Sequence, residues 1–315
     1  MNEPKLPKAR PIGGGPDISA IQKLASRLWP LSWHPGGLGW ALARGRLADE
    51  VVLFDGVDGP AGWGARGMDE PTYLLALADP SVPAVADAIA AWFKDVATAP
   101  EQTIEIAEAD RTLLPALRRA GFGPRHEGTV LGMRHPALHA RVAPLDGYVV
   151  RPVRPDETEA RVEVHRAAWL PASLPYAAQH RPPVEPGATS SFTLAAYEAV
   201  RSTWLYDPAF DLVAVAPDGS LAACCIAWYD PASGVAEIEP LGVVPEHRGR
   251  GLAGALCHEV AARVGEAGGG EVFINAGPRP EYPAPGRAYA RAGFEAYVRA
   301  NKYLCSKAGT GAPAD

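Results

Sequence analysis

Apolar residues recur at a helical spacing in the C-terminal half of the chain. Leu252, Leu256, Val260 and Val264 lie four residues apart, so they share one face of a helix. Around this helix, apolar stretches bounded by turn residues predict strands. The predicted order is a strand at 148–153, helices at 155–169 and 191–204, strands at 211–216, 221–229 and 235–244, a helix at 252–266, a strand at 271–275, a helix at 286–292 and a strand at 294–304.

The N-terminal half repeats the later part of this order. Its pattern predicts strands at 50–54, 62–66, 72–77, 102–107 and 129–133, with helices at 82–96 and 111–120. The tripeptide at 120–122, Ala-Gly-Phe, recurs at 292–294. Two tandem copies of one α+β unit explain this pattern better than one large sheet. We expect each copy to be a mixed, mostly antiparallel twisted sheet flanked by helices.

The expected domains are residues 17–140 and 146–306. The boundary falls in the segment 136–147. Residues 1–16 and 307–315 are rich in Gly, Pro and Ala, and we expect them to be flexible tails.

Composition narrows the class of protein. The 315 residues are 47% apolar and 21% charged, which fits packed globular domains rather than a disordered chain. A net charge of -6, without a long Lys/Arg run, argues against nucleic-acid binding. No run of about 18 apolar residues predicts a membrane helix, and the N-terminal residues lack the apolar core of a signal peptide. We therefore expect a cytoplasmic protein without a membrane or nucleic-acid partner.

The four cysteines are Cys224, Cys225, Cys257 and Cys305. No pair has the spacing of metal ligands, so we expect no metal site. Adjacent Cys224 and Cys225 should point to opposite faces of a strand. Reduced, buried thiols are the expected state.

A glycine-rich turn between the strand at 235–244 and the helix at 252–266 carries candidate chemistry. Gly249 and Gly251 let the backbone turn tightly and approach a ligand closely. The first N–H groups of the following helix lack partners and carry partial positive charge, a geometry that binds phosphate. Arg248 and Arg250 add full charges.

The sequence of this turn has three other interpretations. Residues 249–254 formally fit the dinucleotide fingerprint G-x-G-x-x-G, but the motif lies deep in its domain and the next strand ends in Asn275 rather than an acidic residue. A Walker loop would need Gly-Lys-Ser/Thr, which does not follow here. A turn that binds no ligand is the third reading.

The turn and a later motif resemble those of the GNAT (Gcn5-related) N-acetyltransferases. The family motif V-x-P-x-x-R-G-x-G-x-A matches residues 243–253 at every fixed position, from Val243 through Pro245 to Ala253. A second family mark, Y-x-x-x-G-F, is present at Tyr289–Phe294. The resemblance covers residues 148–304. It implies an acetyl-CoA-dependent enzyme of the tandem-domain type, with two GNAT-like domains.

The resemblance also assigns residues to the coenzyme. Backbone amides at 248–253 would hold the pyrophosphate, and the strand before them would face the pantetheine and the acetyl carbonyl. The residues so assigned are Leu241, Val243, Val244, Arg248, Gly249, Arg250, Gly251, Leu252 and Ala253.

Acetyl transfer to an amine needs two proton movements. The amine attacks only when neutral, so a base must take its proton, and the leaving thiolate benefits from an acid. Glu237 and Glu239 alternate along the strand and lie upstream of the acetyl site, where many family members keep a basic glutamate. Either can be the base. Tyr289 matches the family's usual acid.

The sequence departs from the family around the last helix. Many members have an asparagine seven residues before the tyrosine, where this chain has Tyr282. The loop at 276–286 contains four prolines and is longer than usual. In the family, the acceptor cleft is walled by the first two helices and their connection. Here that connection is the Pro-rich segment 170–190, and His165 and Trp169 share a face of the helix before it.

The N-terminal copy lacks this chemistry. After its strand at 72–77 comes a stretch without Arg or Gly, in which Asp79 would repel a pyrophosphate. The tyrosine position holds Leu117. We expect a degenerate, non-catalytic domain that packs like the second subunit of a dimer. The chain would then be a monomer with pseudo-dimeric domain pairing, or a homodimer.

The favoured function is an N-acetyltransferase that acts on the primary amine of a small molecule. Two alternatives remain open. One is a non-catalytic acyl-CoA-binding regulator, which would have no need of both a glutamate and the tyrosine. The other is a tandem enzyme like mycothiol synthase, which acetylates a cysteine-sugar amine.

Overall fold

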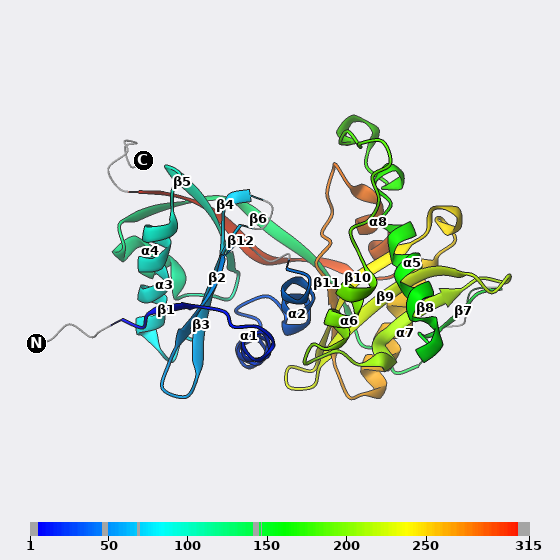
Figure 1. Cartoon of the computed structure of the whole chain (residues 1–315), viewed down its shortest axis with the longest axis horizontal. Helices are drawn as coiled ribbons and strands as arrows, with labels where there is room; N and C mark the ends of the chain where they lie inside the picture. Colours follow the sequence, from blue (N-terminus) through cyan, green and yellow to red (C-terminus); the bar gives the residue numbers. More distant parts are fainter. Residues whose placement is uncertain (1–5, 46–49, 68–69, 141–144, 146, 308–315) are drawn as a thin grey trace, which may run out of the picture. The chain divides into compact units, whose positions relative to one another are not determined.

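The computed structural model describes residues 6–45, 50–67, 70–140, 145 and 147–307, and Figure 1 shows the course of the chain. The chain divides into two compact units. The first comprises residues 1–130 and 298–315, and the second comprises residues 131–297. The expected two-domain α+β architecture is present, and the domain limits at 140 and 146 stay predictions.

The second unit contains a mixed sheet in the order β6-β11-β10-β9-β8-β7. Its neighbouring strands are antiparallel, except that β10 and β11 are parallel. The strands are β6 (Phe122–Pro136), which enters with its last residues, β7 (Val149–Pro152), β8 (Asp211–Val215), β9 (Leu221–Asp230), β10 (Val235–Val243) and β11 (Glu271–Ile274). The helices are α5 (Thr158–Ala168), α6 (Leu194–Arg201), α7 (Leu252–Glu266) and α8 (Pro283–Arg291).

Helices cover both faces of this sheet (Figure 1). In β8, Leu212 and Ala214 pack in one apolar cluster with the buried side of α7. Val213 lies between them in sequence and packs instead with Val164 of α5. Because successive strand residues point to opposite faces, α7 and α5 lie on opposite sides of the sheet.

A buried polar cluster fixes α5 and α6 against β8. Arg161 of α5 and Asp211 of β8 are both fully buried, with Nε and Oδ1 2.8 Å apart. The hydroxyl groups of Tyr197 and Tyr206 donate to the other carboxylate oxygen, at 2.8 Å and 3.0 Å. This charge-assisted network holds the two helices in a defined position on their face of the sheet.

The first unit is built in the same way. Its sheet order is β1-β2-β3-β4-β5-β12-β6, with the first residues of β6 as the last strand. Alternate residues of β4 pack with α3 and with α1 and α2, so helices again cover both faces. The elements are β1 (Ala9–Pro11), α1 (Gly15–Leu28), α2 (Pro35–Ala43), β2 (Glu50–Asp55), β3 (Pro60–Gly67), β4 (Glu70–Ala78), α3 (Pro83–Val96), β5 (Glu101–Ala107), α4 (Leu113–Arg119) and β12 (Glu295–Lys307).

Each unit takes strand residues from the other half of the sequence. Residues 300–306 of β12 pair with β5 in the first unit. Residues 133–136 of β6 pair with β11 in the second. Hydrophobic patterning cannot reveal this exchange, because it shows that a strand exists but not its neighbour.

The expected N-terminal tail is too long. Residues 1–5 lie outside the described part of the chain, but β1 pairs with β2, and α1 begins at Gly15. Arg10 fixes this segment by ion pairs with Asp17 and Asp55, at 2.9 Å and 2.6 Å. Most of the expected C-terminal tail, residues 308–315, is also outside the described residues.

Two cysteine predictions are confirmed, namely that the thiols are buried and that Cys224 and Cys225 point to opposite faces of a strand. All four thiols are free and buried. Cys225 packs in the cluster with α7, whereas Cys224 packs in the cluster with α5, so the two point to opposite faces. Burial raises the pKa of Cys224 to about 11 and that of Cys257 to about 12, which keeps these thiols protonated and unreactive at neutral pH. In the described part of the chain, no helix is long and apolar enough to span a membrane.

Candidate functional site

Two neighbouring strands separate in the middle of the second unit. The parallel pairing of β10 with β11 is confined to residues 235–237 and 271–273. In the same stretch the register between β10 and β9 shifts between Ile238 and Leu241, which marks a bulge. Beyond these points residues of both strands line a cavity of about 910 Å³. Separation of the strands therefore opens the sheet at its centre.

The cavity reaches both faces of the sheet. Ile238 and Ile274 belong to the apolar cluster on the α7 side. Glu239 and Asn275 follow them by one residue, so their side chains point to the α5 side. The lining includes Glu239 and Asn275 as well as Tyr289 from the α7 side. A ligand that enters from one face can thus meet a second ligand from the other.

The glycine-rich turn forms one wall of the cavity. Gly249 and Gly251 line it with φ angles of 78° and 84°, a left-handed conformation that side chains disfavour. Gly251 is the N-cap of α7 and provides no side-chain cap for the first helical N–H groups. Leu252 and Ala253, which carry two of those N–H groups, also line the cavity. The helix start is open to an anion, as expected.

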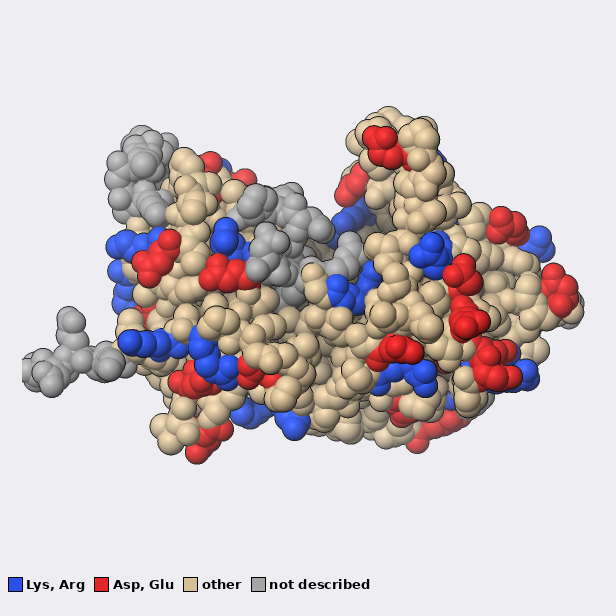
Figure 2. Space-filling view, viewed as in Figure 1, with Lys and Arg blue, Asp and Glu red and all other residues tan. Residues whose placement is uncertain are grey.

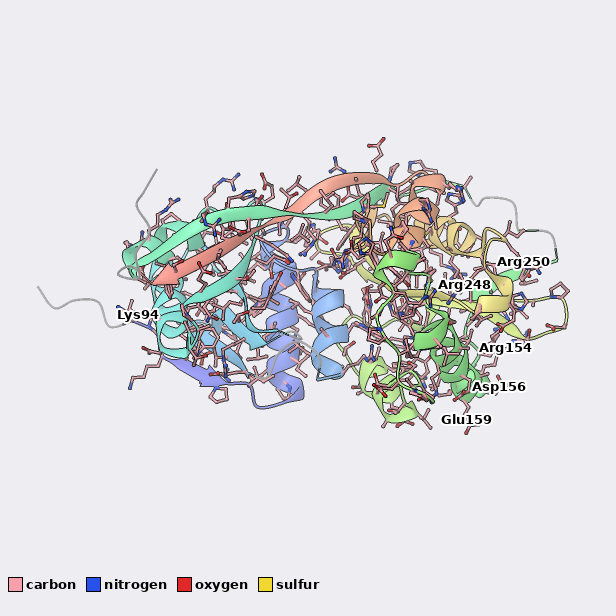
Figure 3. The ribbon with its side chains drawn as sticks, turned by 90° about the horizontal axis from the view of Figure 1, so that it is seen from above. Lys94, Arg154, Asp156, Glu159, Arg248 and Arg250 are labelled. Atoms are coloured by element: carbon pink, nitrogen blue, oxygen red, sulfur yellow. The ribbon has the colours of Figure 1, made fainter. Side chains whose placement is uncertain are left out.

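The two arginines of the turn, both labelled in Figure 3, have different environments. The Arg248 guanidinium donates from Nε to the Val243 carbonyl and from another nitrogen to the Ala168 carbonyl, both at 3.0 Å, and it also donates to the Ser173 carbonyl. Its charge therefore serves to tie the turn to β10 and to the end of α5. Arg250 is exposed and is not among the lining residues. Their roles in coenzyme binding stay predictions.

Other cations line the cavity, and sequence reasoning missed them. Arg279 comes from the loop before α8, and Arg287 and Arg291 come from α8 itself. Their helical spacing of four residues puts Arg287 and Arg291 on one face of α8. This four-residue spacing could have predicted the two arginines from the sequence, but the unusual loop before α8 left the start of that helix uncertain.

The two candidate bases have different environments. Glu239 is half-buried and lines the cavity. Glu237 is 1% exposed, is not a lining residue, and accepts a hydrogen bond from Nδ2 of Asn275 at 2.5 Å. The backbone carbonyl of Glu239 accepts from Nε1 of Trp228 at 2.6 Å, which fixes the strand at the bulge. Geometry favours Glu239 for direct contact with a ligand and Glu237 for contact through Asn275.

Tyr289, the candidate acid, is 5% exposed and lines the cavity from α8. Burial raises the pKa of Tyr289 well above its ordinary value of 10.0. The phenol therefore remains protonated at neutral pH and is able to donate a proton. The remaining predicted coenzyme residues Leu241 and Val243 line the cavity, whereas Val244 is buried and does not.

The corresponding position of the first unit is occupied by a side chain of the protein. Asp79 follows β4 and precedes α3. Its carboxylate accepts from the amide and hydroxyl of Ser81 at 2.9 Å and 2.6 Å, and it pairs with Arg27 at 2.8 Å. Burial opposes ionisation, but these bonds outweigh it and lower the pKa of Asp79. A fixed carboxylate thus stands where a coenzyme phosphate would have to bind.

We expect one acyl-CoA per chain. Asp79 and the missing glycines should exclude a phosphate from the first unit, whereas the turn at 249–251 should accept one in the second. Isothermal titration calorimetry of the purified chain with acetyl-CoA measures the ratio. Two equivalent sites per chain would contradict this expectation.

Comparison with known proteins agrees with this geometry. Residues 176–294 match the model of the acetyltransferase (GNAT) family. Residues 176–294 of the second unit therefore resemble a GNAT acetyltransferase domain. The chain as a whole has the two-domain α+β architecture of tandem GNAT proteins. No curated protein matches the chain.

Three solved structures share the fold over nearly the whole chain. A tandem GNAT protein from the clavulanic acid biosynthesis pathway has a TM-score of 0.52 at 15% identity, with 98% of this chain and 99% of that chain covered. L-PGS from Bacillus licheniformis has a TM-score of 0.57 at 12% identity, with 96% of both chains covered. The C-terminal domain of a putative lysylphosphatidylglycerol synthetase from Agrobacterium fabrum has a TM-score of 0.56 at 13% identity, covering 93% and 92%. Identities this low establish the fold alone.

Proposed function

We propose that the chain is an acetyl-CoA-dependent N-acetyltransferase that acetylates the primary amine of a small molecule. The observation that carries the proposal is the cavity through the gap between β10 and β11. It joins an uncapped helix start on one side to Glu239 on the other. A two-substrate transfer needs such a passage, because the acetyl donor and the amine must meet within it.

The coenzyme would enter from the α7 side. Its pyrophosphate would accept hydrogen bonds from the first N–H groups of α7, and Arg287 and Arg291 would add positive charge at the same wall. The extended pantetheine arm would run along β10 past Leu241 and Val243, where the strand edge no longer pairs with β11. The thioester would then lie at the gap.

The amine would approach from the α5 side, next to Glu239. Glu239 takes a proton from the ammonium form, directly or through a water, and the neutral nitrogen attacks the acetyl carbonyl carbon. The new C–N bond forms as the C–S bond breaks. The Tyr289 phenol gives its proton to the departing sulfur, so that CoA leaves as the thiol. The products are an N-acetylated amine and free CoA.

Release of CoA thiol is the test of this function. The purified chain is mixed with acetyl-CoA and single members of a panel of primary amines, and free thiol is followed over time. We expect release that depends on an amine and on active protein. An acyl-CoA regulator would bind acetyl-CoA but release no thiol with any amine of the panel.

Replacing Tyr289 by Phe is expected to lower kcat by about 10-fold to 100-fold, since the thiolate then leaves without its proton donor. Because the pKa of Tyr289 lies well above 10.0, the wild-type phenol stays protonated from pH 7 to pH 10. The loss should therefore be the same factor across this range, with the acetyl-CoA Kd unchanged. The matched control is Tyr229→Phe. The Tyr229 hydroxyl donates to the Ala267 carbonyl outside the cavity. An unchanged kcat in Tyr289→Phe would remove Tyr289 from the mechanism.

A further inference from the structure

Two aromatic side chains line the part of the cavity that faces α5 and the loop before α8. Trp169 follows α5, and Tyr282 ends the loop at 276–282. One face of the Trp169 ring stacks on His165, with ring centroids 4.2 Å apart and an interplanar angle of 17°. The centroid of the His165 ring lies in turn 3.9 Å from that of Phe192. This stack fixes the orientation of the indole, which is half-buried.

The indole lies against the backbone of β10 at the gap. A Cβ atom built on Gly242 would stand 2.2 Å from a ring carbon of Trp169, so only glycine permits this approach. Gly242 lies between Leu241 and Val243, the residues that would follow the pantetheine arm. Trp169 is therefore beside the position proposed for the acetyl group.

Contacts between two loops hold Tyr282, the second of these aromatic side chains, in place. The amide of Ala177 donates to the Glu281 carbonyl at 3.0 Å, and the rings of Tyr176 and Tyr282 lie 4.9 Å apart. These contacts join the Pro-rich segment 170–190 to the loop before α8. Figure 2 shows the lobe formed by this segment as mostly uncharged surface.

The charges of the lining limit the acceptor to one ammonium group. Among the described residues that line the cavity, Glu239 is the only carboxylate. Four arginines line it as well, and Arg279 belongs to the same loop as Tyr282. A second or third ammonium group on the acceptor would have no carboxylate to meet and would face guanidinium groups instead.

We propose that the acceptor is an arylalkyl monoamine, in which a flat aromatic ring is joined to a primary amine by a short aliphatic linker. The amine lies at Glu239, and the ring packs against Trp169 and Tyr282, which supply apolar area and aromatic contact. This assignment of a substrate class rests on the proposed function. It makes Trp169 a specificity-determining residue.

The test compares initial rates for four amines: tryptamine, phenethylamine, 2-cyclohexylethylamine and spermidine. We expect the two aryl amines to have the highest kcat/KM and spermidine the lowest. In Trp169→Leu, kcat/KM for tryptamine should fall about tenfold or more, mainly through KM, with an unchanged acetyl-CoA Kd. The variant Trp169→Phe should retain most of the activity, and the exposed Trp204→Leu serves as the matched control.

The outcomes separate the two proposals. A preference for spermidine or for 2-cyclohexylethylamine would overturn the arylalkyl assignment and leave acetyl transfer standing. Wild-type kinetics for tryptamine in a folded Trp169→Leu would also overturn it. Absence of thiol release with every amine, despite tight acetyl-CoA binding, would overturn the proposed function and the assignment with it.

Discussion

Replacing Glu239 by Gln is expected to lower kcat/KM for the amine by about 100-fold to 10,000-fold, the usual contribution of a general base. Glutamine keeps the shape and the hydrogen-bonding reach of the side chain but cannot accept the proton. The acetyl-CoA Kd should stay near the wild-type value, because Glu239 lies on the side of the gap away from the helix start of α7. Steady-state kinetics with varied amine, together with calorimetry for the coenzyme, separates the two effects.

Two further variants make the assignment specific. Glu246→Gln changes an exposed glutamate in the turn after β10 that does not line the cavity, and it should leave the rate unchanged. Glu237→Gln addresses the other candidate base, which contacts Asn275 rather than the cavity. If the large loss appears in Glu237→Gln and not in Glu239→Gln, the proton passes through Glu237. If neither variant loses activity, no carboxylate of β10 is the base.

Replacing Gly251 by Trp is expected to weaken acetyl-CoA binding about 100-fold or more, which corresponds to about 3 kcal/mol. The residue has a φ angle of 84° at the N-cap of α7 and lines the cavity. A side chain there strains the turn and occupies the approach to the helix N–H groups that would bind the pyrophosphate. Calorimetric titration with acetyl-CoA measures the change.

Gly219→Trp is the matched control for backbone strain. Gly219 has a φ angle of 86°, with open space around its Cβ position, in the turn between β8 and β9. It should lose stability through the same strain while binding acetyl-CoA normally. Wild-type affinity in a folded Gly251→Trp variant would show that the coenzyme phosphates bind elsewhere.

The sequence predicts local structure in the second unit well. The helix expected at 252–266 has those bounds in the structure, because its apolar face, its preceding glycines and the following Gly run all act locally. The strand expected at 235–244 corresponds to β10. The backbone conformation of the glycine-rich turn was also predictable from residue type, because a positive φ angle favours glycine.

What the sequence did not predict depends on tertiary neighbours. The helix α2 (Pro35–Ala43) begins with Pro-Gly-Gly, a pattern typical of a loop; a nitrogen of His34 accepts from the Gly36 amide and caps it. The long-range partners of β6 and β12 lie outside any local pattern. Within the site, the guanidinium of Arg248 was expected to add charge for a phosphate, but tertiary contacts direct its donors to three backbone carbonyls.

The candidate acid could be named from sequence because Tyr289 occupies a motif position, and the two candidate bases because Glu237 and Glu239 alternate along the strand before the glycine-rich turn. Their environments could not. The bulge after Ile238 and the separation of β10 from β11 determine that Glu239 reaches the cavity while Glu237 stays buried beside Asn275. The aromatic contribution of Trp169 also depends on Gly242, a residue that local pattern does not link to it.

The most direct test of the account is transfer of a labelled acetyl group by the purified chain. Acetyl-CoA carrying a ¹³C-labelled acetyl group is incubated with tryptamine and the wild-type chain, and in parallel with Glu239→Gln and with Gly251→Trp, and the amine is analysed by mass spectrometry. We expect the wild type to transfer the label to the amine nitrogen, and product formation to fall strongly in both variants. Binding of one acetyl-CoA per chain without any labelled amine, for tryptamine and for every other amine of the panel, would contradict it.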